Sequence, residues 1–292
     1  MANSVKIQWY PGHMEKTRRQ MEEKLKAVDM VIEIRDARMP MASRNPLLNQ
    51  LASGKEKLII LSKSDMADPV ATKKWIEYLN KDKVKAIALD IIHDNSSGKK
   101  VVKEALKLME PKRQIQRNKG INPRAIRAMA CGIPNVGKST MINHIAKRKS
   151  AKVEDKPGVT RSLTWIHADE QLDLLDTPGV LWPKFDDDKM AAILAAYGSI
   201  NDDILDKKMV AMDAIHIIQD LYPNHLEELF DCENVNPNGM LKAICEKRNL
   251  KKEKDELDVK RAAELFLNEL RKGKLGKLSL EHVEENSEEV HE

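Results

Sequence analysis

The sequence has few aromatic residues, few cysteines and no long apolar run, and each shortage excludes a class of protein. Phe, Trp and Tyr make up 4% of the 292 residues, so aromatic platforms for stacking single-stranded bases are poorly supplied. No stretch approaches ~18 uninterrupted apolar residues, and the N-terminus lacks the pattern of a secretory leader. We therefore expect a cytoplasmic protein without membrane contact. The cysteines, far apart and without a Cys-x-x-Cys pair, indicate neither a disulfide framework nor a zinc site: Cys131, Cys232 and Cys245.

Charge is distributed unevenly along a chain whose net charge is only +4. Residues 99–127 contain ten basic and two acidic side chains, whereas residues 278–292 contain six glutamates and no Lys or Arg. Such asymmetry is typical of a surface that faces a polyanion together with a solvated acidic tail. An ordinary solvated helix face and linker explain the charge pattern about as well.

Residues 132–139, Gly-Ile-Pro-Asn-Val-Gly-Lys-Ser, match the G-x-x-x-x-G-K-[ST] pattern at every fixed position. We call them the phosphate loop. An apolar stretch at 126–131 predicts a preceding strand and 140–147 a following helix, which is the context the pattern requires. Glycines let backbone N–H groups surround phosphate oxygens, and the helix N-terminus adds its dipole. Lys138 is then expected at the β- and γ-phosphates and Ser139 at Mg²⁺; a coincidental turn is the weaker interpretation.

Two further segments supply groups suited to a metal-bound phosphate. The predicted strand 172–175 leads into Asp-Thr-Pro-Gly, which puts the Asp176 carboxylate at a strand's C-terminal end, where a metal-positioning Asp belongs. Between the two motifs, residues 156–161 form a turn-rich loop whose Thr160 is able to close over the metal. Simple hairpin turns are the alternative for both segments.

Residues 62–65, Ser-Lys-Ser-Asp, follow an apolar strand candidate at 58–61, and we call them the base loop. The Asp65 carboxylate can accept both the ring N–H and the exocyclic amine of guanine, a pair of donors that adenine lacks. Lys63 is able to lay its aliphatic stem along the base plane. Residues 90–98 are expected to supply the last loop at the base. Alone, such a tetrapeptide is usually an ordinary loop.

Together these residues resemble the Asn-Lys-x-Asp, glycine-loop, Thr and Asp-x-x-Gly motifs of the translation-factor class of GTPases, in permuted order. The base loop comes first, then the phosphate loop, Thr160 and residues 176–179. With Trp-Tyr-Pro-Gly-His-Met at 9–14 and Arg-Asp-Ala-Arg-Met-Pro at 35–40, the order resembles the ribosome biogenesis GTPase A family (YlqF type) over nearly the whole chain. The resemblance implies a guanine-nucleotide site with these contacts: Ser62, Lys63, Asp65, Asn135, Val136, Gly137, Lys138, Ser139, Thr140, Thr160 and Gly179, with Ser139, Thr160 and Asp176 at Mg²⁺.

The resemblance also has consequences for catalysis. Ser62 stands where the family has an Asn that ties the base loop to the phosphate loop, and its shorter side chain is expected to loosen nucleotide binding. Guanine selectivity is expected to survive through Asp65. Val180 stands where many GTPases have the glutamine that orients water, so we expect a low intrinsic rate that ribosomes stimulate. The resemblance implicates His13 in catalysis, beside Lys138 and Thr160, and Asn135 in coordinating K⁺. The alternatives are a His13 that caps a turn or contacts a partner, and an ordinary loop asparagine.

The predicted fold class is α/β: a circularly permuted P-loop NTPase with a doubly wound, mainly parallel sheet, followed by a small all-α domain. We expect a GTPase domain at 1–185, a helical, RNA-binding domain at 186–275 and an acidic tail at 276–292. Residues 111–123 are expected to run from the last helix of the first half back to the phosphate-loop strand. Apolar runs predict six strands: 28–34, 58–61, 85–89, 126–131, 163–167 and 172–175.

Three functions are compatible with these features. The first is a GTP-hydrolysing assembly factor that binds the large (50S) ribosomal subunit precursor and its 23S-type rRNA, without DNA, and leaves after hydrolysis. The second is a non-catalytic, nucleotide-gated module for a protein partner, which Ser62 and Val180 favour slightly. The third is an ATPase, which requires Asp65 to be incidental. The oligomeric state is not predicted.

Overall fold

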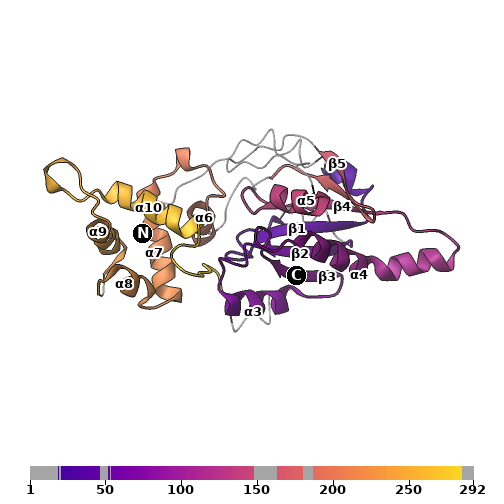
Figure 1. Cartoon of the computed structure of the whole chain (residues 1–292), viewed down its shortest axis with the longest axis horizontal. Helices are drawn as coiled ribbons and strands as arrows, with labels where there is room; N and C mark the ends of the chain where they lie inside the picture. Colours follow the sequence, from indigo (N-terminus) through magenta and orange to yellow (C-terminus); the bar gives the residue numbers. More distant parts are fainter. Residues whose placement is uncertain are drawn as a thin grey trace.

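The structure is a computed structural model that describes residues 19, 21–46, 52, 54–147, 163–179, 187–233 and 235–284. In the described part, six strands form one sheet in the order β3-β2-β1-β4-β6-β5 (Figure 1). All neighbours pair in parallel except β5 and β6, which are antiparallel. The predicted mainly parallel sheet is confirmed, and every predicted strand lies within about two residues of an observed one. The strands are β1 (Met30–Asp36), β2 (Glu56–Ser62), β3 (Val84–Leu89), β4 (Ile126–Cys131), β5 (Thr164–Asp169) and β6 (Leu172–Asp176).

The central strands are apolar because both faces of the sheet are covered. On β1, Met30, Ile32 and Ile34 point into the largest buried cluster, which α4 (Ser97–Asn118) and α5 (Lys138–Ala146) share. Val31 points the opposite way and packs with Met21 in a second cluster. Helix α3 (Pro69–Leu79) covers the same second face beside β2 through a third cluster that contains Trp75. Successive side chains of a strand face opposite sides, so β1 contributes to two cores at once.

Helix α4 corrects the expectation for residues 111–123. The helix runs through Pro111 and ends at Asn118, so that only residues 119–125 connect it to β4. A proline inside a helix removes one backbone hydrogen bond and bends the helix, but does not force it to end. The C-terminal turns of α4 extend beyond the sheet and carry much of the basic segment into solvent (Figure 1).

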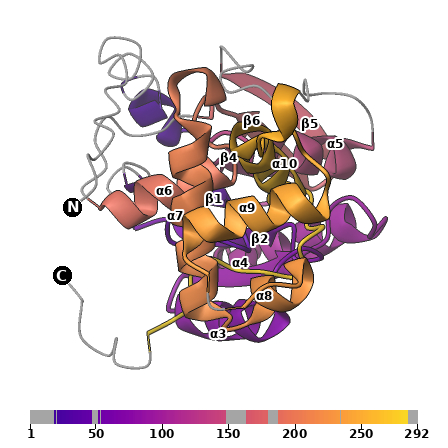
Figure 2. The same cartoon turned by 90° about the vertical axis from the view of Figure 1, so that its left-hand side faces the viewer.

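After the sheet, the described chain is helical. In Figure 1 the helices group at the opposite end of the molecule from the free end of α4, and in Figure 2 they face the viewer. Their buried residues belong to the same continuous apolar cluster as α4 and α5. No helix of the described residues is long and apolar enough to cross a bilayer. The helices are α6 (Asp188–Ala196), α7 (Lys207–Leu221), α8 (His225–Phe230), α9 (Pro237–Lys247) and α10 (Val259–Arg271), with short 3-10 turns η1 (Asp202–Ile204) and η2 (Glu253–Asp255).

The segment that follows α10 returns to the sheet. Leu278 and Leu280 are buried, and the Leu280 N–H donates to the carbonyl of Arg38 at 2.8 Å. The Glu281 carboxylate accepts hydrogen bonds from the N–H groups of Met41 and Ala42 at 2.7 and 2.8 Å. The expectation of a solvated tail is therefore wrong for 278–281, because the turn after β1 offers backbone donors that a carboxylate satisfies. Residues 285–292 lie outside the described part.

Candidate functional site

The phosphate loop has the backbone that its glycines predict. A Cβ on Gly132 would lie 2.6 Å from the carbonyl oxygen of Ile34, so no larger residue fits between β4 and β1. Gly137 has a φ of +86° and Asn135 a φ of 63°, a left-handed conformation that glycine and asparagine tolerate best. The loop leads directly into the first turn of α5, where backbone N–H groups without helical partners attract anions.

Lys138 and Asp176 meet at the C-terminal edge of the sheet. Lys138 opens α5, Asp176 ends β6, and the lysine Nζ donates to the aspartate Oδ1 in a buried ion pair. Asp176 lies opposite Ala130 in the pairing of β6 with β4, and Thr177 donates to the Ala130 carbonyl at 3.0 Å. The parallel strands thus bring a cation and a carboxylate together beside the phosphate loop, which is the donor set that a metal-bound phosphate requires.

The remaining phosphate-side residues surround this pair. Ser139 and Thr140 follow Lys138 in the first turn of α5 and are half-buried. Gly179 lies against the phosphate loop, where an added Cβ would be 3.2 Å from the Pro134 nitrogen. The two glycine-containing segments that the sequence separates by about forty residues therefore pack against each other.

The base loop is tied to the phosphate loop by two side chains. The Ser62 hydroxyl donates to the carbonyl of Val136 (Oγ to O 2.6 Å) and lies 2.9 Å from the carbonyl of Arg35. Lys63 has a φ of 56°, and its Nζ donates to the Asn135 carbonyl at 2.7 Å. The buried serine thus reaches the phosphate loop without the longer side chain of asparagine. The expected loosening of nucleotide binding stays a prediction.

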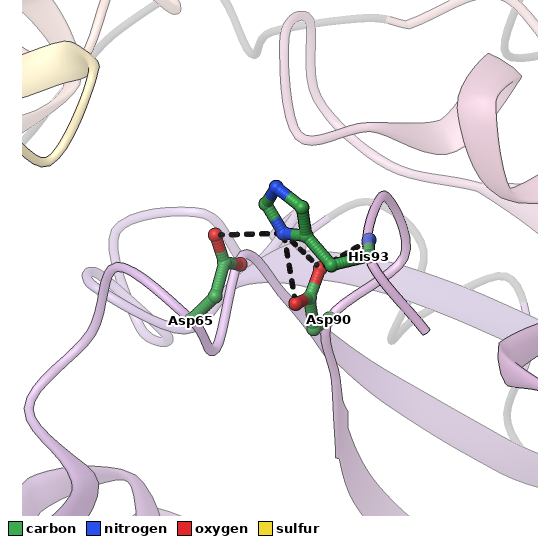
Figure 3. A group of neighbouring side chains, drawn as sticks. All are labelled: Asp65, Asp90 and His93. Atoms are coloured by element: carbon green, nitrogen blue, oxygen red, sulfur yellow. Dashed lines mark hydrogen bonds and ion pairs between the residues drawn. The ribbon is translucent and has the colours of Figure 1, made fainter. Parts of the chain in front are cut away.

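Asp65, Asp90 and His93 form a half-open group at the other end of the base loop (Figure 3). The His93 Nδ1 lies 2.9 Å from Asp90 Oδ2 and 3.8 Å from Asp65 Oδ2. Their ligand atoms lie within 4.8 Å of one another, close enough for a cation, although exposed acidic groups commonly occur without one. The Asp65 side chain is 22% exposed, so a ligand with two adjacent N–H donors is able to reach its carboxylate. Gly98, in the loop expected at the base, packs on α5, where a Cβ would lie 2.7 Å from the His144 carbonyl oxygen; a contact of this loop with the base stays a prediction.

Comparison with known proteins places this geometry in a family. Residues 127–256 match the MMR_HSR1 family, described as 50S ribosome-binding GTPase. The chain is 44% identical over 287 residues to ribosome biogenesis GTPase A of Bacillus cereus, covering 97% of this chain and 96% of the relative. Its counterpart from Thermotoga maritima is 31% identical, with 96% and 95% covered. The chain belongs to the ribosome biogenesis GTPase A family.

Solved structures of the family agree with the fold. The GDP-bound structure of TM YlqF superposes with a TM-score of 0.66 at 28% identity, covering 91% of this chain and 99% of that one. GNP-bound YlqF from T. maritima gives 0.65 at 28% identity, covering 91% and 98%. The circularly permuted P-loop fold and GTP hydrolysis are thus properties of this family member, and the predicted family is confirmed.

Two further residues of the site come from the motif at 35–40. Asp36 ends β1 and Arg38 follows two residues later, and both side chains are buried. Burial alone would raise the pKa of Asp36, but the charges of Arg38 and Lys63 hold it well below its usual range. The signal in the sequence was a charged Asp-Ala-Arg directly after an apolar strand, where a solvated turn is the ordinary interpretation.

Some predicted site residues fall outside the described part of the chain. His13 and Thr160 lie there, as do Val180 and the motif at 9–14. Their roles remain predictions. The described residues bring together the phosphate loop, the base loop, Asp176 and Gly179.

Proposed function

We propose that the phosphate and base loops together bind one guanine nucleotide with Mg²⁺. The supporting observation is that Ser62 and Lys63 join the two loops while Lys138 and Asp176 meet beside them. Lys138 and the N–H groups of 136–140 hold the phosphates, and Asp65 accepts from the guanine edge with Lys63 beneath the base. Ser139, Thr160 and Asp176 hold Mg²⁺, whose charge neutralises the phosphates when bound.

For hydrolysis, we propose that His13 orients or deprotonates the attacking water, because Val180 has no hydrogen-bonding group. Thr160 closes over the metal and Lys138 stabilises the charge on the transferred phosphate. Intrinsic turnover is low and ribosomal particles stimulate it. K⁺ binds at the Asn135 side-chain oxygen; equal turnover in potassium and sodium buffers would contradict this assignment.

We further propose that the chain acts on the large (50S) subunit precursor, contacts 23S-type rRNA, and leaves after hydrolysis in the cytoplasm. The family name supports a ribosomal partner. Charge supports RNA: one row of α4 presents Lys99, Lys103 and Lys107 to an open groove of about 470 Å³ that reaches Asp169. Lysines four residues apart on a helix are separated by about 6 Å, and such side chains bind RNA mainly through phosphates.

Cosedimentation with immature and mature large subunits, in GDP and in a non-hydrolysable GTP analogue, tests this proposal. We expect binding to one particle in the GTP state, release in GDP, and weakening with added salt. Identical binding in both nucleotide states would contradict release after hydrolysis. The charge-neutralising pair Lys99→Gln and Lys103→Gln should weaken particle binding without altering GDP affinity. Lys85→Gln, a lysine on β3 outside the groove, is the matched control.

Turnover distinguishes the assembly factor from the nucleotide-gated module. Ribosomal particles should raise GTP turnover of the wild-type chain, and Lys138→Ala should abolish the increase. A chain that binds particles in a nucleotide-dependent way without stimulated turnover would be a gated module instead.

A further inference from the structure

The Arg38 guanidinium connects the base and phosphate loops to helices α6–α10, which we call the helical half; the sheet and its covering helices are the sheet half. Its Nε and one terminal nitrogen hold both oxygens of Asp36, at 2.9 and 2.8 Å. The other terminal nitrogen donates to the carbonyl of Arg271 at 3.0 Å, at the C-terminal end of α10. The guanidinium also lies 4.0 Å from the ring centre of Tyr197, just after α6. Arg38 is 1% exposed, so these contacts replace its solvation rather than supplement it.

Asp36 carries the connection to the base loop. Its Oδ2 accepts from Arg38 and lies 2.9 Å from the Nζ of Lys63. The same Nζ donates to the Asn135 carbonyl of the phosphate loop. The ammonium of Lys63 is therefore held between a buried carboxylate and a carbonyl, and its place beneath the proposed base site depends on Asp36 keeping its orientation.

The contacts close into a ring on the helical side. The Asn135 side-chain amide donates to the carbonyl of Gly198 at 2.6 Å. Gly198 follows α6, whose last carbonyls, Ala195 and Ala196, accept from Arg271 at 3.0 and 2.9 Å. We call this closed set the Arg38 ring: Asn135, Lys63, Asp36, Arg38, Arg271 and Gly198.

We propose that Arg38 is a positioning residue for the guanine nucleotide and that the Arg38 ring couples nucleotide affinity to the docking of α6 and α10 on the sheet. The proposal rests on the nucleotide site proposed above. Asn135 belongs to the phosphate loop and makes two contacts of the ring: its carbonyl accepts from Lys63 and its side-chain amide donates to Gly198. A ligand that moves the phosphate loop therefore disturbs both contacts. By linkage, the factor by which nucleotide binding shifts the docking equilibrium of α6 and α10 equals the factor by which docking of these helices changes nucleotide affinity.

The decisive variant is Arg271→Gln, because its side chain is only partly buried and its loss leaves Asp36, Arg38 and Lys63 intact. Gln is too short to reach the α6 carbonyls. We expect the Kd for GDP to rise at least about fivefold. In the wild-type chain GDP should change the hydrogen-exchange rate of residues 195–198, and in Arg271→Gln this change should be lost. Arg38→Lys keeps the charge but loses the two-pronged contact, and should have the same effect.

Arg248→Gln is the matched control. It removes an exposed arginine that follows α9 and pairs with Glu269 of α10, the helix that also carries Arg271. This pair lies outside the ring. Its Kd should stay within about twofold of wild type and its exchange response should persist. Thermal unfolding without nucleotide establishes that each variant is folded.

Several results would overturn the coupling. One is a folded Arg271→Gln chain with wild-type affinity and exchange response. Another is a wild-type chain that binds GDP with no change in exchange at 195–198, which decides the matter even if a variant fails to fold. A wild-type chain that binds no guanine nucleotide would instead remove the nucleotide site itself.

Discussion

The sheet half and the helical half of the molecule bury different kinds of side chain. Among the described residues, the buried charged side chains all precede residue 177. Between 187 and 271, Ser199 is the one buried polar residue in the described part, and the rest of the interior is apolar. Burying a charge costs several kcal/mol unless it is well paired. The sheet half holds its buried charges in ion pairs such as Arg38–Asp36 and Lys138–Asp176, and the helical half has no buried charge to pair in its described residues. The buried charges of the sheet half are Glu33, Arg35, Asp36, Arg38, Glu56, Lys138 and Asp176.

This contrast separates ligand binding from stability. Substitution of Lys138, whose buried ion pair lies beside the phosphate loop, should act mainly on nucleotide binding. Substitutions in the apolar interior of the helical half should act mainly on the free energy of unfolding. Substitutions in the Arg38 ring should change both nucleotide binding and the free energy of unfolding, because the ring joins the two halves.

Lys138→Ala should have the largest effect. Removing one partner of a buried charge pair costs about 2–5 kcal/mol in binding, so the Kd for GDP should rise about 10³-fold, measured by titration with a fluorescent nucleotide. Lys103→Ala on α4 is the control for loss of one positive charge. If Lys138→Ala bound GDP with wild-type affinity, the buried lysine would have only a structural role, and the two halves would not differ in the way described.

Leu241→Ala in α9 should show the reverse pattern. The side chain is fully buried among apolar neighbours of the helical half, so its truncation should lower the free energy of unfolding by about 3 kcal/mol. Urea denaturation measures this loss. In the folded protein the Kd for GDP should be unchanged. A shift in this Kd would show that the interior of the helical half is coupled to the nucleotide site through contacts other than the Arg38 ring.

Asp65→Asn tests the proposed contact to the guanine edge, where the carboxylate is partly exposed. Asn offers one donor and one acceptor in place of two acceptors, so GTP affinity should fall about 100-fold. Xanthosine nucleotides, with a carbonyl in place of the exocyclic amine, should gain affinity. Competition between the two nucleotides measures the change, and retained preference for guanine would place the base elsewhere.

Glu281→Gln sharpens the contrast, because the pKa of Glu281 is raised whereas that of Asp36 is lowered. Burial raises the pKa of Glu281 from 4.5 to about 7 despite its two backbone donors, so the folded state favours its protonated form. Its stabilisation is fully present below pH 4.5 and is lost as the pH rises through about 7. Asp36, with its pKa lowered, has the opposite sign: its stabilisation is lost as the pH falls below 3.8.

Urea denaturation at about pH 5 and about pH 8 measures the Glu281 effect. The wild-type chain should lose about 2 kcal/mol more than Glu281→Gln between these conditions. Equal losses would mean that Glu281 is ionised throughout and that its two N–H donors outweigh burial.

The sheet and the loops could be predicted because they depend on local sequence. Strands with both faces covered are continuous apolar runs, and the phosphate-loop glycines are required at fixed spacing. Residues 111–118 of α4 lie almost entirely in solvent, so packing does not hold them. Side-chain contacts along the helix, Arg117 to Glu110 and Gln114 to Asn118, accompany its continuation past Pro111, a residue that bends a helix without forcing it to end. The helical half was predicted as helices, although no pattern indicated that its interior would join the cluster of α4 and α5.

The pairings of buried charges could not be predicted in the same way. Arg38 and Arg271 are 233 residues apart, so only the folded chain shows that a solvated-looking Asp-Ala-Arg is enclosed. Glu281 belongs to an acidic stretch that suggested solvent, and its partners are backbone donors, which leave no mark in the sequence. The site residues His13 and Thr160 stay predictions.

The contact between Glu281 and Met41 spans 240 residues. A ribosome therefore releases the turn after β1 long before it makes the carboxylate that completes that turn. Contacts between residues so far apart in sequence make folding slow, and during synthesis the N-terminal part of a chain is the first that can fold. The N–H groups of Met41 and Ala42 therefore lack their carboxylate partner until Glu281 has been synthesised.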